Sequence, residues 1–504
     1  MDVALWGLAE NPALPGAFVD RLIEGDVDDM VGSALAHRPD LSHGQALALA
    51  ERVEGADVSL AYAGKLTAAD VDPVRQPEAA LALLDEGRGV AEWARVIAAR
   101  AVVRRREKLA ACAGLPADVV EALAGDVDVC VVAELAAFGT PEVAAGLAGH
   151  PHARVRRAVA SNPATPPGVL GMLATGEGLS PVLWCAGCER GAVPLFHADD
   201  CPESEGELPC DGVCDGSHPA ALAGIRYALA GNPAAPAATV VGFVGDADSS
   251  VRWELAGRED LPQEVYARLA VDAHDGVRGV VAGNPAIGEA VARALAQDDV
   301  VAVRRALAHN PSVPLDVLVS LAGVPKVGAD LLPRVAAASL AEVVELAASK
   351  DASVRALAAH RRDLPDGVRD ALAVDPDAKV VKAVAAHPGL SEGQLRGMVE
   401  RHGVRVVARV AVNPDAPPGL LEELALQVPP VAAVLRAVAR RADASSAALV
   451  ACLGDVRSRR IAAAHPALPV EVIVESLGHG DPDVVEAAAS NPSLPVDVML
   501  RLLP

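Results

Sequence analysis

The sequence predicts an all-α fold, a right-handed α-solenoid of short helix pairs with one cysteine-rich metal-binding insertion. Three observations lead to this prediction. Asn-Pro dipeptides recur with a period of 26 residues, as at Asn284 and Asn310. Apolar residues on both sides of each dipeptide follow helical spacing. The chain of 504 residues has only four Trp, three Tyr and four Phe, which suits thin, closely stacked helices. A fixed period of this length is typical of a repeat array, in which each unit buries its apolar face against its neighbours.

The asparagine position of the repeat is filled in three ways. Arg258 and Arg361 hold it without a following proline, and His387 and His465 hold it with one. Asparagine followed by proline stands at Asn11, Asn162, Asn232, Asn284, Asn310, Asn413 and Asn491. The period therefore persists where the residue type changes, which indicates a structural position rather than a short linear motif.

Residues 298–323 show how one unit is built. Asp298 opens the first helix, where a negative charge suits the positive end of the helix dipole. Asn310 follows the last turn, where a residue that tolerates left-handed geometry is expected, and Pro311 prevents the helix from continuing. Pro314 then begins a second helix. Two helices of roughly 8–10 residues are marginal alone, so stacking must supply their stability.

The pattern covers most of the chain and divides it into three predicted regions. Residues 1–180 and 220–504 form N-terminal and C-terminal solenoid repeats, and 181–219 form an acidic, cysteine-rich insertion. Repeats are degenerate over 56–100, and the copy around 331–350 has lost its Asn-Pro.

These units resemble the leucine-rich repeat variant family, a bacterial α-solenoid with the pattern VRxxLAxNPxLPxxxLxxLAxD. A more distant likeness to HEAT-type repeats lies in the Asp…Val-Arg step. The resemblance covers nearly the whole chain and implies a protein-interaction scaffold, but it implies no particular partner.

Composition narrows the choice of partners. The formal net charge is −23, from 67 acidic and 44 basic residues. Nucleic-acid binders gain affinity by neutralising phosphates, so this balance argues against a general DNA or RNA binder. No apolar stretch of about 18 residues escapes a charge, proline or turn signal, so we expect no membrane span. The N-terminus lacks the basic region of a signal peptide, and we therefore expect a cytoplasmic protein.

A column of arginines lies six residues before the asparagine position. Its members are Arg156, Arg226, Arg252, Arg278, Arg304, Arg355 and Arg459. Such a column could follow a phosphate backbone or an acidic peptide. Acidic residues stand four or six positions before most of its members, such as Asp272 before Arg278, and this favours a structural Asp–Arg ladder.

The alternative function is a HEAT-like nucleic-acid-binding or DNA-repair solenoid. It would need a basic concave groove with aromatic side chains, and Trp253 beside Arg252 and Tyr227 beside Arg226 are the only hints of one. We interpret both aromatic residues as packing. No phosphate-binding loop, nucleophile elbow or His-Glu helix motif stands in the sequence, and we expect no enzymatic activity.

The period breaks once, between Asn162 and Asn232, which are 70 residues apart instead of 26. Within this gap, residues 185–218 contain eight acidic residues, one arginine, five cysteines and two histidines. The candidate metal ligands are Cys185, Cys188, Cys201, Cys210 and Cys214, with His197 and His218 as further candidates. A segment without apolar periodicity cannot fold by burying apolar surface, so a metal is the natural organiser. An acidic loop with free thiols is the alternative.

The metal is either zinc or iron. Four thiolates, from Cys185 with Cys188 and from Cys210 with Cys214, suit tetrahedral structural zinc, and Cys201 or Cys210 would then be spare. Four thiolates also hold a [4Fe–4S] cluster. The leucine-rich repeat variant family includes a type with a cysteine-bound [4Fe–4S] module directly before its repeats, and this resemblance favours iron–sulfur. Here, however, the module has repeats on both sides.

Two further cysteine patterns have simpler interpretations. Residues 214–218 resemble the CDGSH iron–sulfur signature, but the cysteine pair that this signature needs upstream is replaced by Glu203 and Glu205. The match is therefore interpreted as a local coincidence. The remaining cysteines, on apolar repeat faces, are expected to be small core residues: Cys112, Cys130 and Cys452. The sequence thus predicts a scaffold with a structural or redox-sensing metal module.

Overall fold

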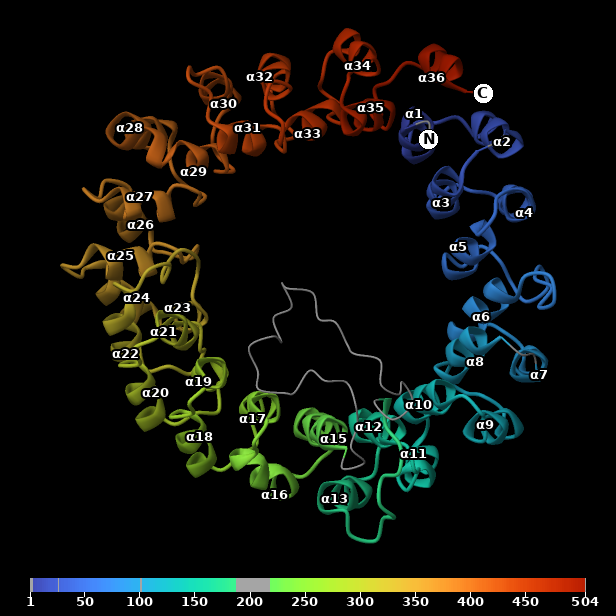
Figure 1. The fold of residues 1–504 in the computed structure, drawn as a ribbon. Coiled ribbons are helices and arrows are strands. Elements are labelled where there is room, and N and C mark those ends of the chain that lie inside the picture. The colour runs from blue at the N-terminus through green and yellow to red at the C-terminus, as the bar shows by residue number, and fades with distance from the viewer. Residues whose placement is uncertain (1–2, 26, 100–101, 187–217, 504) are drawn as a thin grey trace. The chain divides into compact units, whose positions relative to one another are not determined.

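The computed structural model describes residues 3–25, 27–99, 102–186 and 218–503. The chain divides into two units of helices (Figure 1). Unit 1 combines Met1–Asp70 with Lys326–Pro504, and unit 2 is Val71–Pro325. The units change at 70/71, inside the degenerate repeats, and at 325/326, just before the copy that has lost its Asn-Pro.

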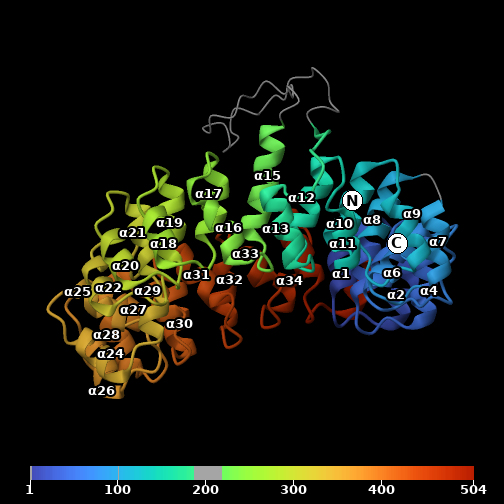
Figure 2. The same cartoon turned by 90° about the horizontal axis from the view of Figure 1, so that it is seen from below.

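Unit 2 consists of helix pairs in chain order. Its helices are α6 (Pro77–Asp85), α7 (Ala91–Ala99), α8 (Val103–Ala110), α9 (Ala117–Ala124), α10 (Val129–Phe138), α11 (Pro141–Leu147), α12 (Ala153–Ser161), α13 (Pro167–Thr175), α15 (Pro219–Gly231), α16 (Ala237–Val240), η2 (Val241–Gly245), α17 (Ser249–Ala256), α18 (Gln263–Leu269), α19 (Asp275–Gly283), α20 (Glu289–Leu295), α21 (Val301–Ala308) and α22 (Leu315–Leu321). Figure 2 shows the longest of these, α15, from the side.

Unit 1 is built in the same way from both ends of the chain. Its N-terminal helices are α1 (Val3–Glu10), α2 (Gly16–Glu24), α3 (Asp29–His37), α4 (His43–Arg52) and α5 (Ala56–Tyr62). Its C-terminal helices are α23 (Pro333–Ala336), α24 (Leu340–Ala347), α25 (Ala352–Ala358), α26 (Asp366–Ala373), α27 (Ala378–Val384), α28 (Glu392–His402), η3 (Gly403–Arg405), α29 (Val407–Ala411), α30 (Pro418–Ala425), α31 (Ala432–Val438), α32 (Ser446–Cys452), α33 (Arg459–Ala463), α34 (Val470–Ser476), α35 (Pro482–Ala489) and α36 (Val496–Leu502).

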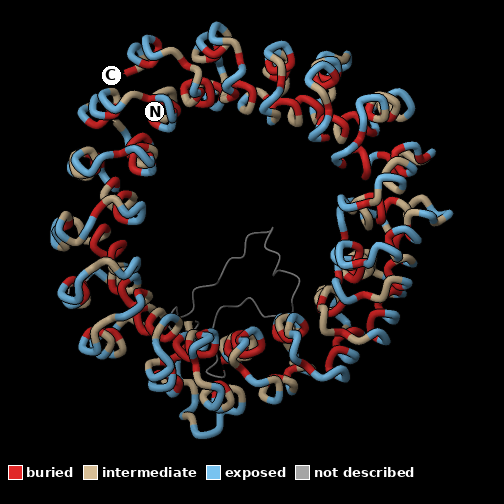
Figure 3. The backbone as a smooth tube through the Cα atoms, turned by 180° about the vertical axis from the view of Figure 1, so that it is seen from behind, coloured by how far each residue is buried: buried red, intermediate tan, exposed pale blue. Residues whose placement is uncertain are grey.

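In each unit the first helices of successive pairs pack on one another and form an inner row, while the second helices form an outer row. The core lies between the two rows, where Figure 3 shows the buried backbone. Leu255 of α17 and Leu269 of α18 are both fully buried there, as the helical spacing of apolar residues predicts. The all-helical solenoid prediction is therefore confirmed for the described residues.

The N-terminal helix pair of unit 1 packs on the C-terminal one (Figure 1). Helix α1 lies against α35, and Gly7 makes their close approach possible. A Cβ atom added at Gly7 would lie 2.2 Å from the carbonyl oxygen of Glu486. The first repeat of the chain thus occupies the place of the repeat that would follow the last one.

Some expectations are confirmed and others stay predictions. The copy around 331–350 forms α23 and α24 although its Asn-Pro is missing. The boundaries 1–180, 181–219 and 220–504 and the right-handed winding stay predictions. No helix in the described parts of the chain has the length and apolar character needed to cross a membrane.

Candidate functional site

The asparagine position makes the same hydrogen bonds in successive repeats. The Nδ2 atom of Asn310 donates to the carbonyl oxygens of Ala282 at 3.0 Å and Asn284 at 2.6 Å, both in the preceding repeat. Its Oδ1 atom accepts from the amide of Ser312 at 2.8 Å. Equivalent bonds to the preceding repeat are made by Asn162, Asn232, Asn284, Asn413 and Asn491. Asn310 thus donates a buried hydrogen bond to a carbonyl 26 residues earlier, and this sequence separation equals the repeat period.

The expected left-handed geometry at this position is wrong. The backbone of Asn232 and Asn284 is extended, with φ of −76° and −75°. Among the described residues other than glycine, only His218 and Lys326 have positive φ. The extended backbone points the amide side chain toward the preceding repeat, and the side chain satisfies the helix-end carbonyls that a left-handed turn would otherwise satisfy.

Where arginine replaces asparagine in the repeat, it forms an ion pair with an aspartate two residues later. Arg258 donates to the carbonyl oxygens of Asn232 at 2.8 Å and Ala235 at 2.7 Å in the preceding repeat. It also pairs with Asp260, two residues later, at 2.6 Å. The same Arg-x-Asp arrangement occurs at Arg38–Asp40, Arg258–Asp260, Arg361–Asp363 and Arg441–Asp443. The carboxylate neutralises a guanidinium that lies largely buried beneath the turn.

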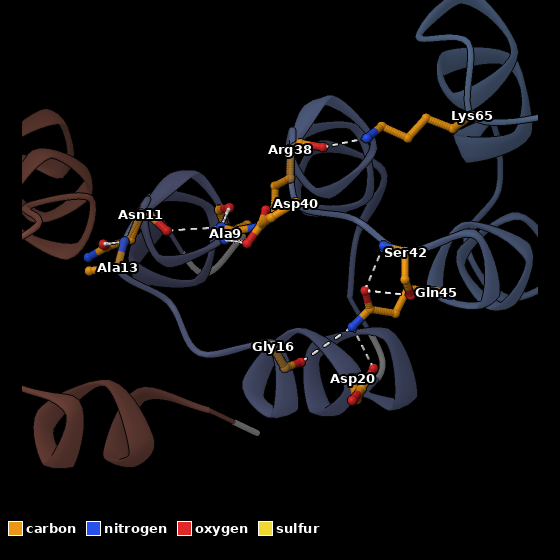
Figure 4. Close-up of polar contacts among 10 residues, drawn as sticks. All are labelled: Ala9, Asn11, Ala13, Gly16, Asp20, Arg38, Asp40, Ser42, Gln45 and Lys65. Carbon is orange, nitrogen blue, oxygen red and sulfur yellow. Dashed lines mark hydrogen bonds and ion pairs between the residues drawn. The ribbon is translucent and has the colours of Figure 1, made fainter.

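We call this set of hydrogen bonds between repeats the inter-repeat ladder. In unit 1 it continues along the N-terminal helices. Figure 4 shows Asn11 and Arg38, whose Nη1 atom donates to the carbonyl of Asn11 at 2.9 Å. Lys65 then donates to the carbonyl of Arg38 at 2.7 Å. Asn11 itself donates to the carbonyls of Ala489 and Asn491, each at 2.8 Å. The contact between the chain ends therefore uses the same bonds that join consecutive repeats.

Histidine also substitutes for asparagine and forms inter-repeat hydrogen bonds. His465 places Nε2 at 3.0 Å from the carbonyl oxygen of Arg441, and its Nδ1 accepts from the amide of Ala467 at 3.1 Å. His387 bonds the carbonyl of Ala359 but, within the described residues, its buried Nδ1 has no hydrogen-bond partner. Burial, followed by the nearby charge of Arg362, lowers the pKa of His387 to about 4.

We expect His387→Asn to make the stability of the protein less sensitive to acid. The folded-state pKa lies below the unfolded value, so the neutral ring stabilises the protein above about pH 6.5, and this contribution is lost as the pH falls toward 4. The loss amounts to about 3 kcal/mol at its limit. Urea denaturation midpoints at pH 7 and pH 5 should therefore differ less in the variant than in the wild type. The exposed His309→Asn is the matched control, and an equal pH response of all three proteins would contradict the expectation.

The arginine column forms the expected ladder with aspartate, although with a different partner. Arg278 binds the carboxylate of Asp298, 20 residues later, at 2.7 and 3.2 Å, and the carbonyl of Asp272, six residues earlier, at 2.9 Å. The predicted partners at four or six positions earlier are therefore wrong for the carboxylate. The same 20-residue pairs are Arg106–Asp126, Arg226–Asp246, Arg252–Asp272 and Arg355–Asp375. Each pair ties a first helix to the start of the next repeat.

Arg156 is an exception beside the insertion. Gly176 stands where other repeats have the aspartate. The guanidinium, only 5% exposed, instead donates to the carbonyl oxygens of His150 at 2.7 Å and Ser180 at 2.6 Å. Burial lowers the pKa of Arg156. Among the described residues, no carboxylate forms an ion pair with Arg156, so this repeat has a buried positive charge next to the segment that leads into the insertion.

The repeats before and after the insertion are direct neighbours. The Nδ2 atom of Asn232 donates to the carbonyls of Ala160 at 2.7 Å and Asn162 at 2.9 Å. These are the ordinary inter-repeat bonds, stretched in sequence to 72 and 70 residues. The 44-residue excess predicted from the broken period is therefore an insertion between two stacked repeats, as expected.

Both ends of the insertion lie at the N-terminal ends of the packed helices α12 and α15. On one side, Trp184 forms a bridge with His152, and its carbonyl accepts from the amide of Ala153 at 2.9 Å. Cys185 follows directly and is buried. On the other side, the buried His218 precedes α15 with a left-handed φ of 53°.

Of the predicted metal ligands, the structure therefore places Cys185 and His218. Cys188, Cys201, Cys210, Cys214 and His197 lie outside the described residues. Sequence reasoning missed His152, which is buried one bridge away from Cys185 and accepts from the amide of Arg154 at 3.0 Å. No local sequence pattern points to this neighbour, because His152 and Cys185 are brought together by the bridge between His152 and Trp184.

The cysteines outside the insertion match their expected role in part. Cys112 and Cys452 are buried, and burial raises the pKa of each thiol to about 11. Cys130 is only half-buried. Its Sγ atom and carboxylate oxygens of Glu107 and Asp128 lie within 4.8 Å of one another. This group could approach a cation, but nothing else at the position points to one.

Stacked helix pairs joined by one recurring hydrogen-bond pattern define this chain as a helical repeat protein of the solenoid class. Residues 153–175 match the family model described as leucine rich repeat variant. This match coincides with one pair, α12 and α13, and confirms the resemblance of the repeat to that family. No curated protein matches the chain.

Proposed function

We propose that the protein is an interaction scaffold that binds other proteins along its inner row of helices. The observation that carries the proposal is the inter-repeat ladder. Its buried hydrogen bonds join consecutive first helices and keep the exposed faces of these inner-row helices in fixed register. Helical repeat proteins commonly use such extended surfaces for protein recognition. The proposal is of a binding protein and includes no catalytic step.

The alternative, a nucleic-acid-processing solenoid, relied on arginines converging on one face. Arg252, Arg278 and Arg355 instead bind aspartate carboxylates. Their charge is neutralised within the repeats, and the net charge of −23 is unfavourable for phosphate. We therefore do not extend the proposal to nucleic acid.

The scaffold proposal is tested with purified components. A tagged chain is used to isolate partners, each candidate is purified, and its dissociation constant is measured with the chain alone. Cross-linking followed by mass spectrometry then locates the contact. Saturable binding with cross-links on inner-row helices supports the proposal. Candidates that fail to bind in purified form, or that cross-link only to outer-row helices, contradict it.

We further propose that the insertion binds a metal through Cys185, Cys188, Cys201, Cys210 and Cys214. Two features of the described residues fit such a group. Cys185 is buried at the edge of the insertion, and the buried guanidinium of Arg156 in α12 donates to the carbonyl of Ser180, five residues before Cys185. A thiolate centre carries negative charge, and a positive charge on the same side of the fold would favour it. Zinc would act as a structural staple, whereas a [4Fe–4S] cluster would add a redox-sensitive element.

The metal proposal predicts that Cys185→Ser lowers the metal content of anaerobically purified protein. Serine is a much weaker ligand for either metal, so metal analysis should show a clear loss, and for iron the broad visible absorption should fall with it. Cys452→Ser, a buried cysteine elsewhere in the chain, is the matched control and should keep the full metal content. Metal-free wild-type protein, or equal content in both variants, would contradict the proposal.

A further inference from the structure

Two open pockets occupy equivalent places in the two units. The pocket in unit 2 measures about 630 Å³ and lies where α15, α17 and α19 meet at their C-terminal ends. The pocket in unit 1 measures about 560 Å³ and lies between α1 and α3. In both, one wall comes from the residues on either side of a ladder asparagine, Asn232 or Asn11, and the other from the next repeat. That next repeat has Arg-x-Asp in place of asparagine in both cases.

The arginine and nearby glycines account for the open space in unit 2. The guanidinium of Arg258 reaches beneath the turn to the carbonyls of the preceding repeat, which leaves its side chain only 8% exposed. Gly231 borders the space that remains. A Cβ atom added at Gly231 would lie 2.4 Å from Oε1 of Glu254. The absence of a side chain at Gly231 therefore leaves room for the carboxylate of Glu254 at the edge of the pocket.

The pocket combines an aromatic wall with an excess of negative charge. Trp253 is 44% exposed and forms part of the lining. Glu254 lies beside it and bonds the hydroxyl of Tyr227. Glu259 and Asp260 complete the acidic lining, and the single arginine is already paired with Asp260. An indole face next to carboxylates is the arrangement that proteins use to bind a cationic side chain.

The same chemistry recurs in unit 1. Its pocket contains Trp6, Glu10 and Asp40, and there too the arginine, Arg38, is paired with the aspartate two residues later. Trp6 stands five residues before Asn11 and belongs to the asparagine-bearing repeat, whereas Trp253 stands five residues before Arg258 and belongs to the arginine-bearing repeat. Both pockets therefore have an indole, carboxylates and an Arg-x-Asp turn, but the indole comes from opposite walls. Two of the four tryptophans of the chain thus line acidic pockets beside Arg-x-Asp turns.

We propose that the pocket of unit 2 binds a lysine or arginine side chain of a partner protein segment. The aliphatic stem lies along Trp253, and the cation approaches Glu254 and Glu259. This inference rests on the proposed scaffold function and names the chemistry of its partner. Basic segments are complementary to the acidic lining, whereas phosphate groups are repelled by it.

The test uses the full chain and a fluorescein-labelled peptide, Gly-Ser-Lys-Arg-Lys-Ser-Gly, with binding followed by anisotropy at 150 mM salt. The conservative Glu254→Gln and the surface variant Trp253→Ala should each weaken binding about tenfold. Glu264→Gln removes the same charge from an exposed position on the outer helix α18 and is the matched control, which should bind as the wild type does. A peptide with neutral citrulline and norleucine in place of the basic residues should not bind. Unchanged melting temperatures establish that the variants are folded.

Several outcomes would overturn the inference. If Glu254→Gln and Glu264→Gln weakened peptide binding equally, the peptide would be attracted only by the general negative charge of the protein. If Trp253→Ala bound the peptide as tightly as the wild type does, the indole would not take part in binding. Absence of binding by the wild type would also reject it. The scaffold proposal is judged separately. A purified partner that binds the wild type and Trp253→Ala with equal affinity would contradict the pocket proposal but would still support the scaffold proposal.

Discussion

Replacing Asn11 by alanine is expected to release the N-terminal repeat from the C-terminal one. Asn11 is fully buried and holds the carbonyls of Ala489 and Asn491. Its loss leaves two buried acceptors without a donor, at about 1–3 kcal/mol each. This contact joins the two ends of the chain, so its loss should separate α1 from α35. Hydrogen exchange measured by mass spectrometry should show both helices exchanging at least about tenfold faster, which corresponds to about 1.4 kcal/mol.

An interior asparagine provides the control. Asn284→Ala removes the same two kinds of bond, to Ala256 and Arg258, between α17 and α19 of unit 2. It should loosen those two helices and leave α1 and α35 protected. Gly7→Leu provides a second route to the first result, because the added side chain would collide with the carbonyl of Glu486. Rapid exchange of α35 in the wild type would instead mean that the contact is not populated.

The contact between α1 and α35 also buries apolar surface. Repeat arrays usually need terminal repeats with a polar outer face, because the end of the stack is otherwise apolar. Here Ala489 of α35 is fully buried and lies against Gly7 of α1, whereas Ala487 packs against Ala463 of the preceding repeat. Within unit 1, α1 thus covers apolar surface of α35.

The sequence predicted where the repeats lie but not what joins them. Helical spacing and proline are local signals, and they placed pairs such as α21 and α22 correctly. The role of Asn310 was missed because its hydrogen bonds end in another repeat, and no local pattern shows which carbonyls accept them. Arg258 was recognised at the position, yet its dependence on Asp260 emerges only when the turn is seen to bury the guanidinium.

The candidate site shows a similar limit. The broken period located the insertion, and Asn232 confirms that it interrupts one inter-repeat contact. The neighbours of Cys185 could not be predicted, because Trp184 turns back to pair with His152 more than thirty residues earlier in the chain. The two pockets were also beyond the sequence. Trp253 was interpreted as packing, but its side chain is 44% exposed and lines the pocket of unit 2, which no local sequence pattern shows.

Replacing Asp298 by alanine is expected to be among the most destabilising single changes in unit 2. Its carboxylate binds Arg278 at 2.7 Å, with side chains only 8% and 17% exposed, and accepts from the amide of Val300 at 2.8 Å. Removing one partner of a buried pair leaves an uncompensated charge and costs about 3–5 kcal/mol. The urea midpoint should fall, and α19 and α21 should lose exchange protection. The adjacent Asp299 is exposed, and Asp299→Ala should change stability by no more than about 0.5 kcal/mol.

Acid should reveal the same pair without a mutation. The hydrogen bond from Arg278 lowers the pKa of Asp298 below its ordinary value, against the opposing effect of burial. Because the folded-state pKa is the lower one, the pair stabilises the protein fully above the unfolded pKa of about 3.9, and this contribution is lost as the pH falls through the folded-state pKa. Asp298→Asn keeps the shape of the side chain but cannot titrate, so its urea midpoint should fall less between pH 5 and pH 3 than that of the wild type. If the urea midpoints of Asp298→Asn and the wild type fell equally, the Arg278–Asp298 pair would contribute hydrogen bonds but little charge stabilisation. The loss of stability expected for Asp298→Ala would then be that of an uncharged hydrogen bond.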